Sequence, residues 1–272
     1  MSAIISFLEN YVTPVVGKLL VGKNRFCNVI YYHDVVSGPG DSFDQTNINT
    51  FKTHMEYLIS NGYETLLFSD LNHPEQLKFK KKRVLITFDD GWKSNYTEIF
   101  DYMQKKGIKY NIFLAVGKIG RDPNFLTWEM IDTMNKSGVV GFGVHSFSHV
   151  DMSKIRNVNT ELEIEKANAL FSSELGTMPE DFCYPYGYYS QESNLFLENK
   201  KCYKRIYTSK KMFSYEENGA IVFGRNGISD DHSMQMFRYK TKGYLNSYKA
   251  IESIFVKPMV SIKALLKKGV ML

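Results

Sequence analysis

The 272-residue sequence has little cysteine and no long apolar run. Its three cysteines show no paired spacing, which argues against a disulfide framework and favours a reducing compartment. No run reaches the ~18 apolar residues that a membrane span requires. Residues 1–24 carry Glu9 and Pro14 where a signal peptide would be apolar. We therefore expect a cytoplasmic protein, located at the inner face of the membrane if it contacts lipid.

The sequence also lacks a strong excess of one charge. The formal net charge is +5, and the basic residues are scattered or lie near the C-terminus rather than forming a stripe with aromatic residues. Nucleic acid is therefore not an expected partner. A hydrophobic content of 43% allows a full core, and an aromatic content of 14% suits either that core or a sugar-binding cleft.

Short apolar runs alternate with amphipathic helical patterns along most of the chain. The runs expected to form strands are residues 27–32, 65–68, 84–88, 110–115, 139–144, 182–184, 205–208 and 220–223. Six or more consecutive β-then-α units predict a parallel barrel or a wound sheet, with its site at the carboxyl ends of the strands. Nothing marks a second domain.

The sequence predicts three segments. Residues 1–24 form an N-terminal helical segment that either packs on the domain or lies on a membrane. Residues 25–246 form the barrel. Residues 247–272 are basic and amphipathic, and they either close the barrel with a helix or lie on anionic lipid as a peripheral contact.

The central strand, residues 84–88, ends in Asp89, Asp90 and Gly91. Neighbouring carboxylates repel each other, so a nearby cation or a shared proton is usually needed. A metal ion is the simplest such cation. The alternative is a surface Asp-Asp-Gly turn with no function of its own.

Two histidines, His145 and His149, follow the strand at 139–144 and are four residues apart. That spacing lets both imidazoles reach one ion from a helical turn or a tight loop. With one aspartate they give two imidazoles and a carboxylate, the ligand set of a catalytic metal site with open positions. The second carboxylate is then free to act as a base. His33 follows the first strand and is either a core residue or a group of this site.

Three segments resemble the first three motifs of the polysaccharide deacetylase family, also called the NodB homology or carbohydrate esterase family. They are Thr87–Gly91, His145–His149 and Tyr184–Gly187, in this order. The resemblance covers about residues 25 to 230. It implies an α/β single domain, an irregular (β/α) barrel with about seven parallel strands. It also implies the removal of acetyl groups from N- or O-acetylated sugars with zinc or another divalent ion.

The resemblance also assigns roles to residues. It makes Asp89 the general base and assigns the metal to Asp90, His145 and His149. It places substrate against the loop of Pro185, Tyr186 and Gly187, with the backbone N–H of Tyr186 holding the oxyanion.

The sequence departs from the family pattern in two places. Cys183 stands where the family has an arginine that orients the base, and we expect Arg225 to supply the missing guanidinium. The closing Leu-x-His motif, whose histidine protonates the leaving amine, is absent, and His232 does not fit it. One branch of the family, which includes poly-N-acetylglucosamine deacetylases, has its motifs in permuted order, and Tyr32-His33 resembles its first strand. His33 is therefore the expected general acid.

The expected function is metal-dependent removal of acetyl groups from an N-acetylated sugar or glycan precursor, with zinc as the expected metal. Two alternatives stay open: an O-acetyl esterase or other amidase that uses the same site, and a catalytically silent glycan-binding barrel. The sugar, its linkage and the oligomeric state have no readable code in the sequence.

Overall fold

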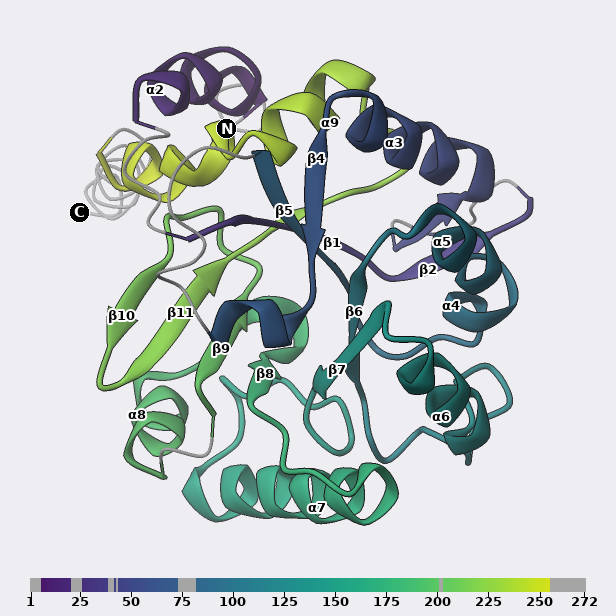
Figure 1. Cartoon of the computed structure of the whole chain (residues 1–272). Coiled ribbons are helices and arrows are strands. Elements are labelled where there is room, and N and C mark those ends of the chain that lie inside the picture. The colour runs from purple at the N-terminus through teal and green to yellow at the C-terminus, as the bar shows by residue number, and fades with distance from the viewer. Residues whose placement is uncertain are drawn as a thin grey trace, which may run out of the picture.

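A mostly parallel ten-stranded sheet organises the chain in the computed structural model, which describes residues 6–20, 26–38, 42, 44–72, 82–200 and 203–254 (Figure 1). Its strands are β1 (Asn28–Tyr32), β4 (Tyr63–Leu66), β5 (Lys82–Phe88), β6 (Tyr110–Leu114), β7 (Val140–Val144), β8 (Asp181–Cys183), β9 (Arg205–Thr208), β10 (Tyr215–Glu217), β11 (Ala220–Gly224) and β12 (Asn226–Gly227). β2 (Asp34–Val36) and β3 (Gln45–Asn47) pair in a separate parallel two-stranded sheet. The helices are η1 (Leu8–Val12), α2 (Thr13–Leu20), α3 (Ile48–Ser60), η3 (Phe68–Asn72), α4 (Ser94–Thr97), α5 (Phe100–Lys106), α6 (Trp128–Lys136), α7 (Asn157–Leu175), η5 (Pro185–Gly187), α8 (Gln191–Lys200), α9 (Met234–Thr241) and η6 (Tyr244–Ser247).

The strands follow the order β10-β11-β9-β8-β7-β6-β5-β1-β12, with β4 paired to the first half of β5. Every pairing in this sheet is parallel except the one between β10 and β11. β11 pairs with β9 on one side of the structure, and β12 pairs with β1 on the other. Arg225 is the one residue between β11 and β12, so the chain closes the barrel at this position. The expected irregular (β/α) barrel is confirmed.

Helices surround the sheet (Figure 1). Their ends follow local rules: the Asn47 side chain accepts a hydrogen bond from the N–H of Asn49 at the start of α3, and the Thr127 hydroxyl accepts one from Met130 at the start of α6. Gly107 ends α5 in the left-handed conformation, as the sequence predicts. Because the helices lie around the outside of the sheet, the strands have helices on one side and the barrel interior on the other.

Side chains of β5 alternate between these two environments. Val84, Ile86 and Phe88 belong to the large core between sheet and helices, whereas Leu85 belongs to a second cluster together with Phe113 and Phe223. Because strand side chains alternate, Thr87 and Asp89 follow Leu85 on the inner face. The strand register therefore directs Asp89 into the barrel.

Some local expectations needed correction. The apolar spacing between Gly91 and Gly107 predicts a single helix, but the structure divides this stretch into α4 and α5, and the sequence did not indicate β10 or α9. In the N-terminal segment, Leu8 packs against Ile251, with Val12 and Val16 beside them. No helix in the described part of the chain has both the length and the apolar character that crossing a membrane requires. Of the 247–272 segment expected to close the barrel or contact lipid, residues 255–272 lie outside the described residues. The division into three segments stays a prediction.

Candidate metal and catalytic site

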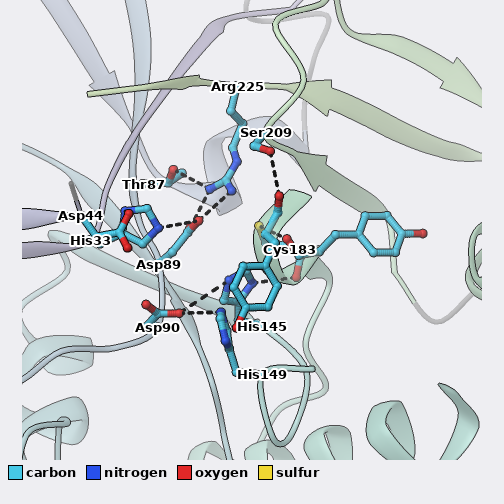
Figure 2. Close-up of polar contacts among 12 residues, drawn as sticks. His33, Asp44, Thr87, Asp89, Asp90, His145, His149, Cys183, Ser209 and Arg225 are labelled. Atoms are coloured by element: carbon cyan, nitrogen blue, oxygen red, sulfur yellow. Dashed lines mark hydrogen bonds and ion pairs between the residues drawn. The ribbon is translucent and has the colours of Figure 1, made fainter. Parts of the chain in front are cut away.

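The two aspartates after β5 face different partners (Figure 2). Asp89 is 3% exposed and Asp90 is 8% exposed. Asp90 and Gly91 both adopt positive φ, 75° and 84°, so the chain turns sharply directly after Asp89. This turn separates the directions of two adjacent carboxylates. The indole N–H of Trp92 donates to Oδ2 of Asp90 at 3.0 Å, which leaves Oδ1 for another partner.

Asp90 faces the two histidines that follow β7. Its Oδ1 lies 3.0 Å from Nε2 of His149 and 3.7 Å from Nε2 of His145. His145 Nδ1 lies 2.8 Å from the carbonyl oxygen of Cys183, which can only accept, so Nδ1 carries the proton and Nε2 presents its lone pair. Burial lowers the pKa of His145 to about 4, so the ring is neutral at physiological pH. A neutral imidazole with a free Nε2 is the form that binds metal.

The three side chains fit a divalent cation. Ligand atoms of Asp90, His145 and His149 all lie within 4.8 Å of one another. Although Asp90 Oδ1 is buried beside two ring nitrogens, it makes no hydrogen bond. Burial opposes the charge of Asp90, yet the neighbouring rings of His149 and His145 hold its pKa below the usual value. A metal ion would bind between this ionised, unsatisfied oxygen and the two imidazoles.

A second group of potential ligands, Asp89, His145 and Cys183, fits a metal less well. Burial raises the pKa of the Cys183 thiol well above its usual value, whereas a metal requires the thiolate. Both oxygens of Asp89 are also engaged by a guanidinium. The candidate metal site is therefore the set with Asp90.

Arg225 makes a two-pronged ion pair with Asp89. Nη1 donates to Oδ1 and Nη2 to Oδ2, each at 2.7 Å, and Nη1 also lies 3.3 Å from the hydroxyl of Thr87. The guanidinium is 1% exposed and lies 4.3 Å from the ring centre of Tyr31. Burial alone would raise the pKa of Asp89, but Arg225 lowers it below the usual value. The structure thus places the guanidinium of Arg225 on Asp89, beside the Cys183 position.

His33 follows β1 and approaches the Asp89 carboxylate from the side opposite Arg225 (Figure 2). Its Nε2 lies 3.9 Å from Oδ2 of Asp89, and its Nδ1 lies 3.7 Å from Oδ1 of Asp44. The side chain is 20% exposed, so it borders both the buried pair and solvent. His232 contacts Ser229 and Lys240 instead. The structure therefore brings His33, and not His232, to the site.

The loop Pro185–Gly187 forms η5 directly after β8 and borders the histidines. Tyr186 has φ 59°, its ring centre lies 4.7 Å from that of His149, and its side chain is 58% exposed. Ser209 donates to the Tyr186 carbonyl at 3.1 Å, and a Cβ on Gly187 would clash with the same serine. The loop is thus held in place while the Tyr186 ring stays open to a ligand.

Backbone strain concentrates at this site. Five non-glycine residues among those described have positive φ, and four of them are here: Asp90, Ser146, His149 and Tyr186. Such conformations cost about 1–3 kcal/mol each and persist where the surrounding structure enforces them. Neither this strain nor the contact between Trp92 and Asp90 was expected from the sequence. Asp44 was likewise not expected at the site.

Comparisons with known proteins agree with this geometry. A family model described as "Polysaccharide deacetylase" matches residues 76–202. Over 211 residues the chain is 27% identical to "Putative polysaccharide deacetylase YxkH" of Bacillus subtilis (strain 168), covering 77% of this chain and 74% of that protein. His33 and Arg225 lie outside the region matched by the family model, so their place at the site rests on the structure.

Solved structures share the fold. IcaB from Ammonifex degensii has a TM-score of 0.68 at 21% identity, covering 81% of this chain and 97% of that one. The Streptococcus pyogenes deacetylase PplD, in a structure with acetate, has a TM-score of 0.70 at 19% identity, covering 79% of this chain and 97% of that one. With three motif segments gathered at one end of such a barrel, the chain is similar to the polysaccharide deacetylase family over residues 76–202 and to a curated protein of that description over 211 residues.

Proposed function

We propose that the chain is a metal-dependent hydrolase that removes acetyl groups from an N-acetylated sugar or glycan precursor. The observation that carries the proposal is the division of labour between two adjacent aspartates. Asp89 is ionised and held by Arg225, whereas Asp90 directs an unsatisfied oxygen at two imidazoles. A metal ligand and a base side by side are the parts needed to hydrolyse an amide with water.

Asp90, His145 and His149 would hold a divalent ion. We propose zinc, because zinc is commonly bound by imidazole and carboxylate ligands. The bound ion would supply Lewis-acid activation of the acetyl carbonyl and of water. The chain prepares each ligand. The Cys183 carbonyl fixes the His145 tautomer, and the Trp92 indole fixes the Asp90 carboxylate. These contacts orient the ligands before any ion is bound.

Asp89 acts as the general base in this proposal. It accepts a proton from the water whose oxygen attacks the acetyl carbon. Arg225 occupies one lone pair on each carboxylate oxygen, and a carboxylate has further lone pairs with which to receive that proton. The guanidinium thereby holds the base in its ionised form and in one orientation.

His33 acts as the general acid. It gives a proton to the sugar nitrogen as the carbon–nitrogen bond breaks, so the products are acetate and a free amine. Its distances of 3.9 Å to Asp89 and 3.7 Å to Asp44 keep the ring beside the base and oriented from both nitrogens. The backbone N–H of Tyr186 would donate to the oxyanion of the substrate, and its exposed ring suits contact with a sugar face.

The same groups would also cleave an O-acetyl ester or another amide, because the site acts on the carbonyl and only the acid contacts the leaving group. Product analysis separates these reactions: a free amine supports the proposed deacetylase, and a free hydroxyl supports the esterase. A catalytically silent glycan-binding barrel would release neither product.

The test is acetate release from a panel of N- and O-acetylated sugars and oligosaccharides. We expect release by the zinc-loaded protein, loss after chelation and recovery when zinc is restored. Asp101→Asn, at an exposed position on α5, serves as the matched control and should keep full activity. Zinc bound at one equivalent with no product from any member of the panel would contradict the deacetylase and favour the binding barrel.

A further inference from the structure

The segment between the two histidine ligands is held by a side chain from another element. Residues 146–148 connect His145 to His149 and leave β7 in a strained path, with φ 61° at Ser146 and 60° at His149. Two left-handed residues in so short a segment are energetically unfavourable, so contacts from outside the segment are needed to keep it in one conformation. The spacing of the two Nε2 atoms therefore depends on what fixes these residues.

Glu163 of α7 supplies that fixation. Its Oε2 accepts the backbone N–H groups of Phe147 at 3.1 Å and of Ser148 at 2.8 Å. Its Oε1 accepts the Ser148 hydroxyl at 2.7 Å. One carboxylate thus satisfies two consecutive backbone donors and a side chain, and hydrogen bonds to a charged acceptor are about twice as strong as neutral ones.

Other contacts hold the segment from the barrel side but leave these donors to Glu163. The N–H of Val116 donates to the Ser146 carbonyl at 3.2 Å, and the N–H of Gly117 donates to the Phe147 carbonyl at 2.8 Å. Ser146 Oγ accepts the N–H of His149 at 3.0 Å. The loop 116–117 therefore binds the carbonyl groups, and α7 binds the amide groups on the other side.

We infer that Glu163 is a positioning residue for the metal site: its carboxylate sets the distance and direction of the His149 and His145 ligands without touching the ion. The inference rests on the proposed metal site and extends it to a side chain that lies outside the three motif segments. Outer-shell groups of this kind typically change metal affinity 10- to 100-fold when removed.

The test compares zinc affinity, measured by competition with a chromophoric chelator, in wild type, Glu163→Ala, Glu163→Gln and Glu165→Ala. Glu165 is exposed on the same helix and serves as the matched control. We expect wild-type affinity for Glu165→Ala, affinity 10- to 100-fold lower for Glu163→Ala, and an intermediate value for Glu163→Gln, which keeps one oxygen acceptor for the two amides. The visible spectrum of the Co²⁺ form should also change in Glu163→Ala, because that spectrum reports ligand geometry.

The outcomes separate this inference from the proposed function. Equal zinc affinity and an unchanged Co²⁺ spectrum in wild type and Glu163→Ala would overturn the role of Glu163 and leave the deacetylase proposal standing. Absence of zinc binding in wild type and in Glu165→Ala would overturn the metal site itself, and the inference with it. Should Glu163→Ala fail to fold, Glu163→Gln decides, since wild-type affinity in that variant contradicts the inference.

Discussion

Replacing Arg225 with methionine should disable the base while leaving the metal ligands in place. The guanidinium makes two 2.7 Å hydrogen bonds to Asp89, and both partners are almost fully buried. Breaking a buried pair by removing one partner costs about 3–5 kcal/mol, because the remaining charge is left uncompensated. We expect Arg225→Met to lower the free energy of unfolding by this amount at neutral pH, measured by urea denaturation.

The sign of the pH dependence follows from the Asp89 carboxyl. In wild type its pKa lies below the usual 3.8, so the pair stabilises the fold above about pH 4 and loses this contribution as the pH falls. In Arg225→Met burial acts without the guanidinium and raises the pKa above that value. The stability difference between the two proteins should therefore shrink as the pH falls, first above pH 4, where Asp89 takes up a proton in the folded variant, and further below pH 4, where wild type loses the pair. The acidic limb of kcat/KM should move to higher pH in the variant.

Arg205 offers a matched control for this experiment. It makes the same kind of pair with Asp181, at 2.6 and 2.7 Å, and is 2% exposed, but Asp181 begins β8 whereas the site lies beyond the strand ends. Arg205→Met should lose comparable stability and keep the wild-type acidic limb. Unchanged kcat/KM and pH profile in Arg225→Met would refute the role assigned to Arg225.

Two further predictions concern histidines. His33→Ala should lower kcat about 10²- to 10⁴-fold and leave zinc affinity unchanged, because the proposed general acid does not bind the ion. His232→Ala serves as the control and should retain activity. Full turnover by His33→Ala would exclude His33 as the general acid. His54 is 1% exposed, stacks on Phe237 at 3.9 Å, and burial lowers its pKa to about 4, so stability should fall as the pH drops from 6.5 towards 4. In urea titrations across this range, His54→Gln should lose less stability than wild type, by up to about 3 kcal/mol at pH 4, and equal pH slopes would contradict this reasoning.

The sequence was most informative where a chemical group directly follows a strand. Parallel strands bring their carboxyl ends to one edge, so the positions of Asp89, Asp90 and His145 after strands were enough to predict that they meet. The missing motif arginine at Cys183 pointed to a substitute, and the position of Arg225 after a later strand made it the candidate. The structure places that guanidinium on Asp89.

The features that could not be predicted from the sequence depend on backbone geometry and on hydrogen bonds between residues far apart in the chain. The positive φ of Ser146 and Tyr186 is enforced by contacts from elsewhere in the fold, since neither is a residue type that favours this region. Glu163 lies on a helix whose sequence pattern indicates only which residues are buried or exposed. Its hydrogen bonds to Phe147 and Ser148 therefore could not be predicted from the sequence around it. The cytoplasmic location stays a prediction.

The central claim is that adjacent aspartates hold different roles, and one paired measurement tests it most directly: zinc stoichiometry and acetate release in Asp89→Asn and Asp90→Asn. The account predicts that Asp89→Asn binds one equivalent of zinc and releases almost no acetate, whereas Asp90→Asn loses tight zinc binding as well as activity. Wild-type acetate release by Asp89→Asn, or undiminished zinc affinity in Asp90→Asn, would contradict it.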